Sequence, residues 1–245
     1  MWQTAFGKCI YQTDQGIQVW QNPRYRWLTL GSSAIQTLIK RKSPEKPILE
    51  YIPALTKPLR LYPADFILFG LGGAGLLHYV QHSMPAIPGT VIEIDSEVIA
   101  TAQQFFSLAK LPQLEVLCQS ADDFLAHSKQ QIKHLLIDIY GASSLPPCCL
   151  DINFYRQSHA LLNEDGFLAM NIANGQEQLE VLSLIRAVFS GQTLIIPMKQ
   201  SANIVVLAGK SGVKGLLADL EAAGQVKSLV WNKVWGRIVE LKKYA

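Results

Sequence analysis

The sequence predicts an α/β fold in which a mainly parallel sheet is covered by helices on both faces. From residue 61 onward, apolar strand-like segments alternate with helical patterns, and a glycine-rich turn joins the first of these strands to the first helix. Near the end of the alternation, two strand-like segments follow one another directly. Near-continuous apolar strands alternating with amphipathic helices are typical of parallel sheets with both faces buried.

The expected strands of this sheet are 66–69, 90–94, 114–118, 134–139 and 167–172, and the expected helices are 75–83, 96–109, about 121–131, 152–162 and 176–190. Two further strands, 193–198 and 203–209, are joined by so few residues that only an antiparallel hairpin can connect them. A nicotinamide-binding domain does not need a terminal antiparallel hairpin. Such a hairpin is typical of the Rossmann-like, seven-stranded methyltransferase-type sheet, whose last strand inserts antiparallel. We therefore predict a sheet of this type.

Residues 1–60 predict a small β-rich N-terminal region at one edge of the main domain, which spans residues 61–245. Strand-like segments occupy 16–21, 25–31 and 34–40. Prolines at 44, 47, 53 and 58 make a long helix in the following stretch unfavourable.

Composition excludes several classes of protein. Of the 245 residues, 49% are apolar, which is ample for a core, yet no apolar run approaches the ~20 residues of a membrane span. The first residues lack the apolar core of a signal peptide. The four cysteines show no C-x-x-C spacing. We therefore expect a soluble, cytoplasmic protein. His78 and His82 are four residues apart but have no clear third ligand, so we expect no metal.

Positive charge is concentrated near the N-terminus. Residues 1–60 carry nine Lys and Arg against three acids. The run Lys40-Arg41-Lys42 could contact an anionic partner, although a solvated face is the commoner explanation for such a run. The tail from Val226 to Tyr244 mixes tryptophans with basic residues, which favours a packed amphipathic segment over a nucleic-acid site.

The segment Gly70-Leu71-Gly72-Gly73-Ala74-Gly75 lies between a strand and a helix, and the next strand carries Glu93 and ends at Asp95. Glycines let the backbone approach a ligand, and the start of a helix presents free N–H groups. An acid 18 residues past the last glycine can accept hydrogen bonds from ribose hydroxyls. The pattern predicts a nucleoside above Gly70, Gly72, Gly73 and Gly75 with its ribose on Glu93; a structural turn without a ligand is the alternative. Asp95 is expected to cap the helix that follows.

Ligands of such sheets bind beyond the carboxyl ends of the strands. Asp138 follows an apolar strand there, where it could stabilise a positive charge, accept a proton, or only cap loop N–H groups. Tyr140 is either an acceptor-side group or a core residue. Ser120 or Asp122 could read an adenine amino group, or Ser120 could simply cap a helix. Gln36 would reach a nucleoside only if the N-terminal strands fold over the cleft.

With these residues in view, the chain resembles the spermidine synthase (polyamine aminopropyltransferase) family from about residue 16 to about residue 210. Six family motifs have counterparts in chain order. The motif L-x-L-D-G-x-x-Q is similar to Leu28–Gln36, which is one residue longer and lacks the Asp. The others are G-G-G-D-G-G in Gly70–Gly75, V-E-I-D in Ile92–Asp95, G-D-A in Ser120-Ala121, D-S-S-D in Asp138-Ile139-Tyr140-Gly141, and the F-Y…L-x-x-G-G segment in Asn153–Phe167. The resemblance implies that Ser120 and Ala121 lie at the adenine and that the protein is a homodimer.

Several acids of the family are missing. The glycine-loop Asp, which in the family holds the free amine of decarboxylated S-adenosylmethionine, is assigned to Ala74, and the second Asp of D-S-S-D is Gly141. The Y-x-E motif falls near Glu50-Tyr51-Ile52 without a clean match. A diamine needs several carboxylates as partners for its two ammonium groups, so their loss argues against polyamine synthesis.

We therefore expect a transferase that binds S-adenosylmethionine or its decarboxylated form and acts on a small-molecule acceptor. Transfer of a methyl group to a neutral or anionic acceptor is the first hypothesis. Aminopropyl transfer in polyamine biosynthesis is the second, and a catalytically degenerate homologue that only binds is the third. An NAD-dependent dehydrogenase is the least favoured, because of the terminal hairpin.

Overall fold

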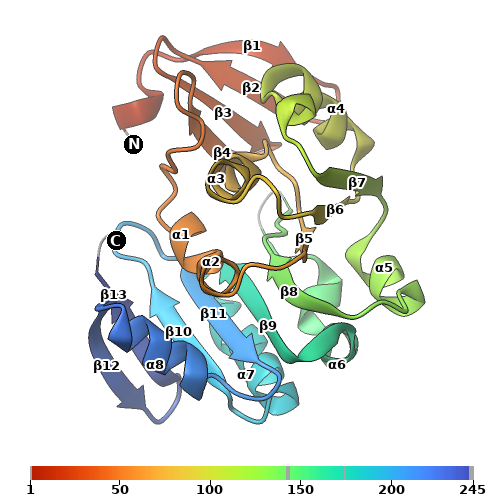
Figure 1. Ribbon diagram of the computed structural model, residues 1–245. Coiled ribbons are helices and arrows are strands. Elements are labelled where there is room, and N and C mark those ends of the chain that lie inside the picture. Colours follow the sequence, from red (N-terminus) through yellow and green to blue (C-terminus); the bar gives the residue numbers. More distant parts are fainter. Residues whose placement is uncertain (1, 142–143, 174, 243–245) are drawn as a thin grey trace.

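The computed structural model describes residues 2–141, 144–173 and 175–242, which form two β-sheets with helices around the larger one (Figure 1). The smaller sheet is an antiparallel meander whose strands lie in chain order, after a short 3-10 helix η1 (Trp2–Thr4). Its strands are β1 (Lys8–Gln12), β2 (Ile17–Gln21), β3 (Tyr25–Leu30) and β4 (Ile35–Lys40). The β-rich character predicted for residues 1–60 is present, and a domain boundary at residue 60 stays a prediction.

The larger sheet has, in the described part of the chain, the strand order β12-β13-β10-β11-β9-β8-β5-β6-β7. The neighbours β9, β8, β5, β6 and β7 pair in parallel, and β11 is antiparallel to both β9 and β10. The strands are β5 (Phe66–Phe69), β6 (Gly89–Glu93), β7 (Leu114–Cys118), β8 (Ile132–Ile137), β9 (Leu162–Ile172), β10 (Thr193–Pro197), β11 (Ile204–Gly209), β12 (Val226–Asn232) and β13 (Gly236–Leu241). The predicted fold class is confirmed.

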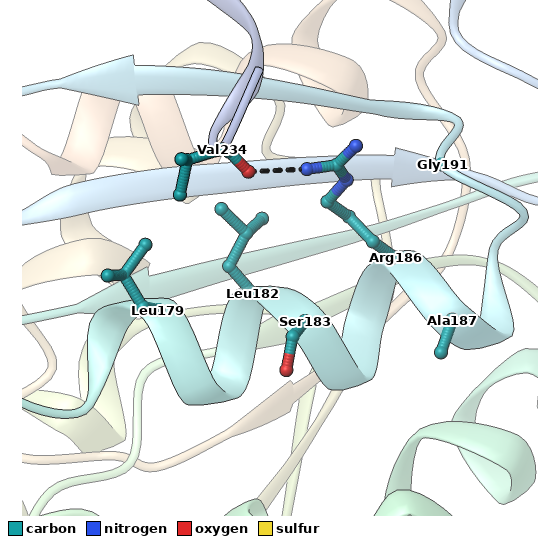
Figure 2. Close-up of a pocket in the computed structure, with 7 residues that line it drawn as sticks. All are labelled: Leu179, Leu182, Ser183, Arg186, Ala187, Gly191 and Val234. Carbon is teal, nitrogen blue, oxygen red and sulfur yellow. Dashed lines mark hydrogen bonds between the residues drawn. The ribbon is translucent and has the colours of Figure 1, made fainter. Parts of the chain in front are cut away.

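The C-terminal tail adds two strands to the predicted seven. Strand β13 pairs in parallel with β10, and β12 pairs antiparallel with β13. The turn of this hairpin rests on a helix, because Arg186 Nη1 donates to the carbonyl of Val234 at 2.6 Å beside a hollow of about 460 Å³ (Figure 2). The tail, as far as residue 242, is thus a hairpin at the sheet edge, and residues 243 and 244 of the predicted segment lie outside the described residues. Val239 of β13 is buried in the core, as the prediction of a packed segment requires, whereas β12 is exposed along most of its length and differs from that prediction.

Helices cover both faces of the larger sheet (Figure 1). Phe66 and Leu68 face a core formed with α1, α2, α3, α4 and α8, whereas Ile67 and Phe69 face a second core formed with α5, α6 and α7. The helices are α1 (Ile52–Leu55), α2 (Lys57–Leu61), α3 (Gly75–Ser83), α4 (Ser96–Phe105), α5 (Ala121–His127), α6 (Ile152–Leu161), α7 (Gln178–Val188) and α8 (Lys214–Ala222), with 3-10 turns η2 (Leu108–Lys110) and η3 (Pro147–Leu150). None of the helices in the described residues is both long and apolar enough to cross a membrane.

A third core fixes the small sheet to the large one. Ile17, Val19, Leu28 and Ile39 pack against Val98 of α4 and against Phe106, which follows that helix. The small sheet therefore lies over the helices that follow β5 and β6, beside the glycine-rich turn.

Local chemistry explains where the helices begin and end. The Asp95 carboxylate accepts the Glu97 N–H at 2.8 Å, which confirms the predicted cap of α4. Helix α4 ends before the predicted residue 109, because Ser107 adopts a left-handed φ of 56°. Helix α5 likewise ends at His127. Between residues 44 and 61, the prolines permit only the short helices α1 and α2.

The buried side chain of His134, on β8, should make the protein less stable at acidic pH. Its buried Nε2 donates to the carbonyl of Tyr62 at 2.7 Å, and desolvation by burial, the largest effect, lowers the pKa of the imidazole to about 4. The unfolded chain, with an ordinary pKa near 6.5, binds the proton first as pH falls. Between pH ~6.5 and ~4, wild-type protein should therefore lose about 3 kcal/mol of unfolding free energy through this residue. Urea denaturation across this window should show a shallower loss for His134→Gln. His82→Gln, at an exposed position of α3, should keep the wild-type slope; an unchanged slope in His134→Gln would contradict the assignment.

Candidate nucleoside site

The predicted site residues converge on one edge of the large sheet. Strands β6, β5 and β8 are neighbours and run parallel, so Glu93, Gly70 and Asp138 lie at their carboxyl ends side by side. The backbone confirms this closeness, since Asp138 N–H donates to Phe69 and Gly70 N–H donates to Ile92. The edge is therefore built by the three central strands of the parallel part.

The turn after β5 needs glycine for packing as well as for any ligand. Gly70 has a φ of 93°, and a Cβ there would lie 2.2 Å from the carbonyl oxygen of Asp138. Gly72 has a φ of 50°, and its Cβ would lie 2.8 Å from the hydroxyl of Thr37. These contacts give Gly70 and Gly72 a structural reason that is independent of a ligand. The glycines therefore define the shape of the turn, and the case for a nucleoside depends on the side chains around it.

The small sheet holds this turn in place. Thr37 of β4 accepts the N–H of Gly73 at 2.8 Å in a buried hydrogen bond. The ring of Phe106 packs so closely on Gly73 that a Cβ would be 2.9 Å from it. Gly75 begins α3 beside Thr37 and Ile39. The N-terminal strands thus pack directly on the glycine turn.

Ala74 adopts the left-handed conformation, with a φ of 57°. This is a conformation that glycine adopts without strain. An ungapped comparison of Gly70–Gly75 with the motif G-G-G-D-G-G places Ala74 at a glycine of the motif and Gly73 at its Asp. The assignment of the missing Asp to Ala74 is therefore corrected to Gly73. In either register, the turn itself carries no carboxylate.

Glu93 points its carboxylate at the glycine turn. One oxygen accepts the Leu71 N–H at 2.9 Å, and the other accepts the Asp95 N–H at 3.1 Å. Burial raises the pKa of Glu93, and the two N–H bonds oppose this rise. Next to it, the side chain of Ile94 is 70% exposed. A fixed carboxylate beside an exposed apolar side chain suits a ligand that has both hydroxyl groups and a flat apolar face.

Asp138 lies within a network of neutral donors. The hydroxyl of Tyr51 donates to Oδ2 at 2.9 Å, and the amide of Asn171 donates to Oδ1 at 2.9 Å. The oxygen of Asn171 in turn accepts the amide of Asn203 at 2.8 Å. Burial raises the pKa of Asp138, while the two hydrogen bonds lower it. Burial and the adjacent carboxylate together raise the pKa of Tyr51 well above its ordinary value. The hydroxyl of Tyr51 therefore stays protonated and serves as a donor.

The other predicted residues have defined contacts. The amide of Gln36 donates to the carbonyl of Gly141 at 3.3 Å, so β4 does reach the loop after β8. The hydroxyl of Tyr140 accepts the Ala173 N–H, and its ring packs on the second core. Ser120 caps α5 by accepting the Asp123 N–H at 3.2 Å. Ala121 is half-buried and Asp122 is exposed in the first turn of that helix. The roles of these residues toward a ligand stay predictions.

Four residues that hold the glycine turn or Asp138 in place are not among those predicted from the sequence: Thr37, Tyr51, Asn171 and Asn203. For Tyr51 a signal existed, because it lies in the segment compared with the Y-x-E motif. Thr37 follows Gln36 directly on β4. Asn171 and Asn203 showed no motif, and only the pairing of β9 with β11 brings them together.

The sequence is similar to those of several polyamine aminopropyltransferases. The polyamine aminopropyltransferase of Neisseria meningitidis is 23% identical over 194 residues, which is 77% of this chain and 74% of the relative. That of Chromobacterium violaceum is 21% identical over 196 residues, 78% and 75% of the two chains. This chain is similar to polyamine aminopropyltransferases. No protein-family model matches it.

Solved structures show the same fold. Spermidine synthase from Thermotoga maritima has a TM-score of 0.66 at 20% identity, covering 83% of this chain and 73% of that one. A spermidine synthase in complex with the transition-state analogue AdoDATO has a TM-score of 0.67 at 20% identity, with coverages of 83% and 74%. Human methyltransferase-like protein 13 in complex with SAH has a TM-score of 0.61 at 18% identity, covering 76% of this chain and 96% of that one.

A methyltransferase also resembles the chain in sequence. The eEF1A lysine and N-terminal methyltransferase homolog of Drosophila melanogaster is 25% identical over 143 residues, which is 54% of this chain but 21% of that protein. The aminopropyltransferase matches therefore extend over more of this chain.

The Thr37–Gly73 hydrogen bond yields a stability prediction. Thr37→Val keeps the shape of the side chain but leaves the buried Gly73 N–H without an acceptor, so the free energy of unfolding should fall by about 2 kcal/mol in urea denaturation. Thr90→Val, at a half-exposed threonine of β6, should change it by less than about 0.5 kcal/mol. Equal effects of the two substitutions would show that this bond does not anchor the turn.

Proposed function

We propose that this chain is a transferase that binds S-adenosylmethionine or a closely related sulfonium nucleoside at the carboxyl edge of the large sheet and transfers a methyl group to a small acceptor. The observation that carries the proposal is the Glu93 carboxylate, which two backbone N–H groups hold against the glycine turn. Each carboxylate oxygen has a second acceptor position, which the two hydroxyls of a ribose can fill.

The residues around Glu93 fit such a ligand. The exposed side chain of Ile94 offers an apolar surface to an adenine ring, and Ser120, Ala121 and Asp122 lie at the start of α5, after the neighbouring strand β7. Among the solved relatives, one holds the analogue AdoDATO and another holds SAH. Both compounds support a ligand of the S-adenosylmethionine type.

Asp138 is the residue that we expect to act on the acceptor, the molecule that receives the methyl group. When bound, the sulfonium nucleoside supplies an activated carbon whose transfer releases a neutral thioether. Asp138, with its raised pKa, can accept the proton that the acceptor loses or stabilise positive charge that develops on it. Tyr51 and Asn171 fix the orientation of this carboxylate. Positioning and electrostatics then account for most of the rate.

We favour methyl transfer over aminopropyl transfer because two acidic residues of the aminopropyltransferase motifs are missing from this sequence. The glycine turn carries no carboxylate for the amine of decarboxylated S-adenosylmethionine, and Gly141 replaces the second Asp of the D-S-S-D motif. Among the described residues, the hydrogen-bond network of Tyr51, Asp138, Asn171 and Asn203 contains a single carboxylate, which gives the two ammonium groups of a diamine too few partners there.

Aminopropyl transfer remains the second candidate because of one specific contact. The structure brings Tyr51, from the segment compared with the family's Y-x-E motif, onto Asp138 at 2.9 Å. The matches to aminopropyltransferases also cover more of this chain, 77% against 54%, than the methyltransferase match does. This candidate predicts tighter binding of the decarboxylated nucleoside.

Isothermal calorimetry tests the nucleoside site. Glu93→Ala removes the proposed ribose acceptor, so the affinity for S-adenosylmethionine should fall at least tenfold, on the order of 1.4 kcal/mol. Glu115→Ala, at an exposed position of β7, is the matched control and should bind as wild type does. Unchanged affinity in Glu93→Ala would place the ribose elsewhere.

The same titration separates the candidate ligands. Wild-type protein is titrated with S-adenosylmethionine, its decarboxylated form, methylthioadenosine and NAD. Tightest binding of S-adenosylmethionine supports methyl transfer, and tightest binding of the decarboxylated form supports aminopropyl transfer. Tightest binding of NAD, or binding of none of the four, would overturn the proposal.

Tyr51→Phe tests the role of Asp138 as a base. The Tyr51 hydrogen bond lowers the pKa of Asp138, so its loss should raise that pKa further. If the ionised carboxylate accepts a proton during transfer, the acidic limb of kcat against pH should move to higher pH in Tyr51→Phe. Tyr79→Phe, whose hydroxyl contacts Arg60, should leave the limb in place. A limb that does not move in Tyr51→Phe would exclude Asp138 as the base.

A further inference from the structure

A second hollow, of about 260 Å³, lies between the small sheet and the helices α3 and α4. Its lining includes the basic side chains Arg26, Arg41 and Lys42, together with His78, Phe106 and Ser107. None of these residues belongs to the proposed nucleoside site, although Phe106 also packs on Gly73 of the glycine turn. The hollow therefore lies next to the turn and is lined by different side chains.

The three basic side chains have no acidic partner. Among the described residues, none of them forms an ion pair with a carboxylate. Arg26 donates from three of its five N–H groups, to the carbonyl of Phe105 and to the amide oxygen of Gln21. These acceptors are neutral. They orient the guanidinium but do not neutralise its charge, and they leave N–H groups free for a ligand.

The charges of Arg26 and Arg41 are close enough to affect one another. Burial, the larger effect, and the neighbouring Arg41 lower the pKa of Arg26. Arg41 is itself held by the carbonyls of Asn22 and Pro23, each at 3.3 Å. Gathering like charges around a hollow costs free energy, and that cost is offset when an anion enters.

His78 does not add to this charge. Its Nε2 donates to the carbonyl of Phe106 at 2.7 Å, and desolvation lowers its pKa, so the ring is neutral near pH 7. Glu45 is the acidic group within electrostatic reach of His78, and it does not line the hollow. The lining is therefore positively charged at neutral pH through Arg26, Arg41 and Lys42.

We propose that this hollow binds a phosphate group, held by Arg26, Arg41 and Lys42. Its volume is below the range of about 300–1,000 Å³ that is usual for drug-sized ligands, which suits a small anion. A phosphate carries about −1.5 to −2 charges at pH 7 and three strong acceptor oxygens. Guanidinium groups match these oxygens with paired N–H donors, and a lysine adds a point charge. Two residues of the run Lys40-Arg41-Lys42, Arg41 and Lys42, thus have a proposed role beyond a solvated face.

Calorimetry with inorganic phosphate, at constant ionic strength kept with chloride, tests this site in the whole protein. Wild type should bind phosphate at one saturable site. The double variant Arg41→Gln/Lys42→Gln changes two exposed side chains, so it should fold normally and bind at least tenfold more weakly. Arg156→Gln, an exposed arginine on α6, removes one charge elsewhere and should bind as wild type does.

One further variant and one further ligand complete the test. Lys42→Gln alone changes a side chain that forms no hydrogen bond or ion pair with the described residues, and it should weaken phosphate binding at least threefold. Titration with O-phosphoserine distinguishes the sources: tighter binding than inorganic phosphate indicates a phosphate group carried by a larger molecule, and weaker binding indicates the free ion. No saturable binding of either compound, or equal phosphate affinity in wild type and the double variant, would overturn the proposal. Neither result depends on the nucleoside site.

Discussion

The buried hydrogen bond from Gly73 N–H to the Thr37 hydroxyl is the contact on which the rest of the site depends. It joins the small sheet to the turn after β5, and it requires a residue without Cβ at position 72, where a side chain would meet the same hydroxyl at 2.8 Å. The turn and β4 therefore need each other. A buried N–H without an acceptor costs about 1–3 kcal/mol, which is enough to disfavour a turn that is not covered by β4.

Because β4 is fixed at Thr37, the neighbouring N-terminal residues reach the carboxyl edge. Gln36 contacts the loop after β8, and Tyr51 contacts Asp138. The acceptor side of the proposed site is thus formed jointly by the N-terminal region and by β8, β9 and β11. The match to an aminopropyltransferase covers 77% of the chain, whereas the methyltransferase match covers 54%.

Sequence reasoning succeeded where the determinants are local. The alternation of apolar strands and helices predicted the parallel sheet, and Asp95 was predicted as a cap because it directly precedes a helical pattern. Sequence reasoning did not predict contacts between segments that are far apart in the chain. Tyr51 and Asp138 are 87 residues apart, and Asn203 reaches Asn171 only through the pairing of β11 with β9. The hairpin of β12 and β13 was missed because β12 is exposed on both faces and lacks an alternating apolar pattern.

The electrostatics of Asp138 narrow the choice of acceptor for the proposed transfer. A neutral amine or hydroxyl becomes positive as it takes the methyl group, and a carboxylate nearby stabilises that charge or removes the proton. An anionic acceptor would instead bring a second negative charge to a buried carboxylate whose bonds come from neutral donors, Tyr51 and Asn171. That approach would raise the pKa of Asp138 further and remove the charge on which catalysis relies. Of the two acceptor classes first considered, a neutral acceptor is therefore the better match to this side of the site.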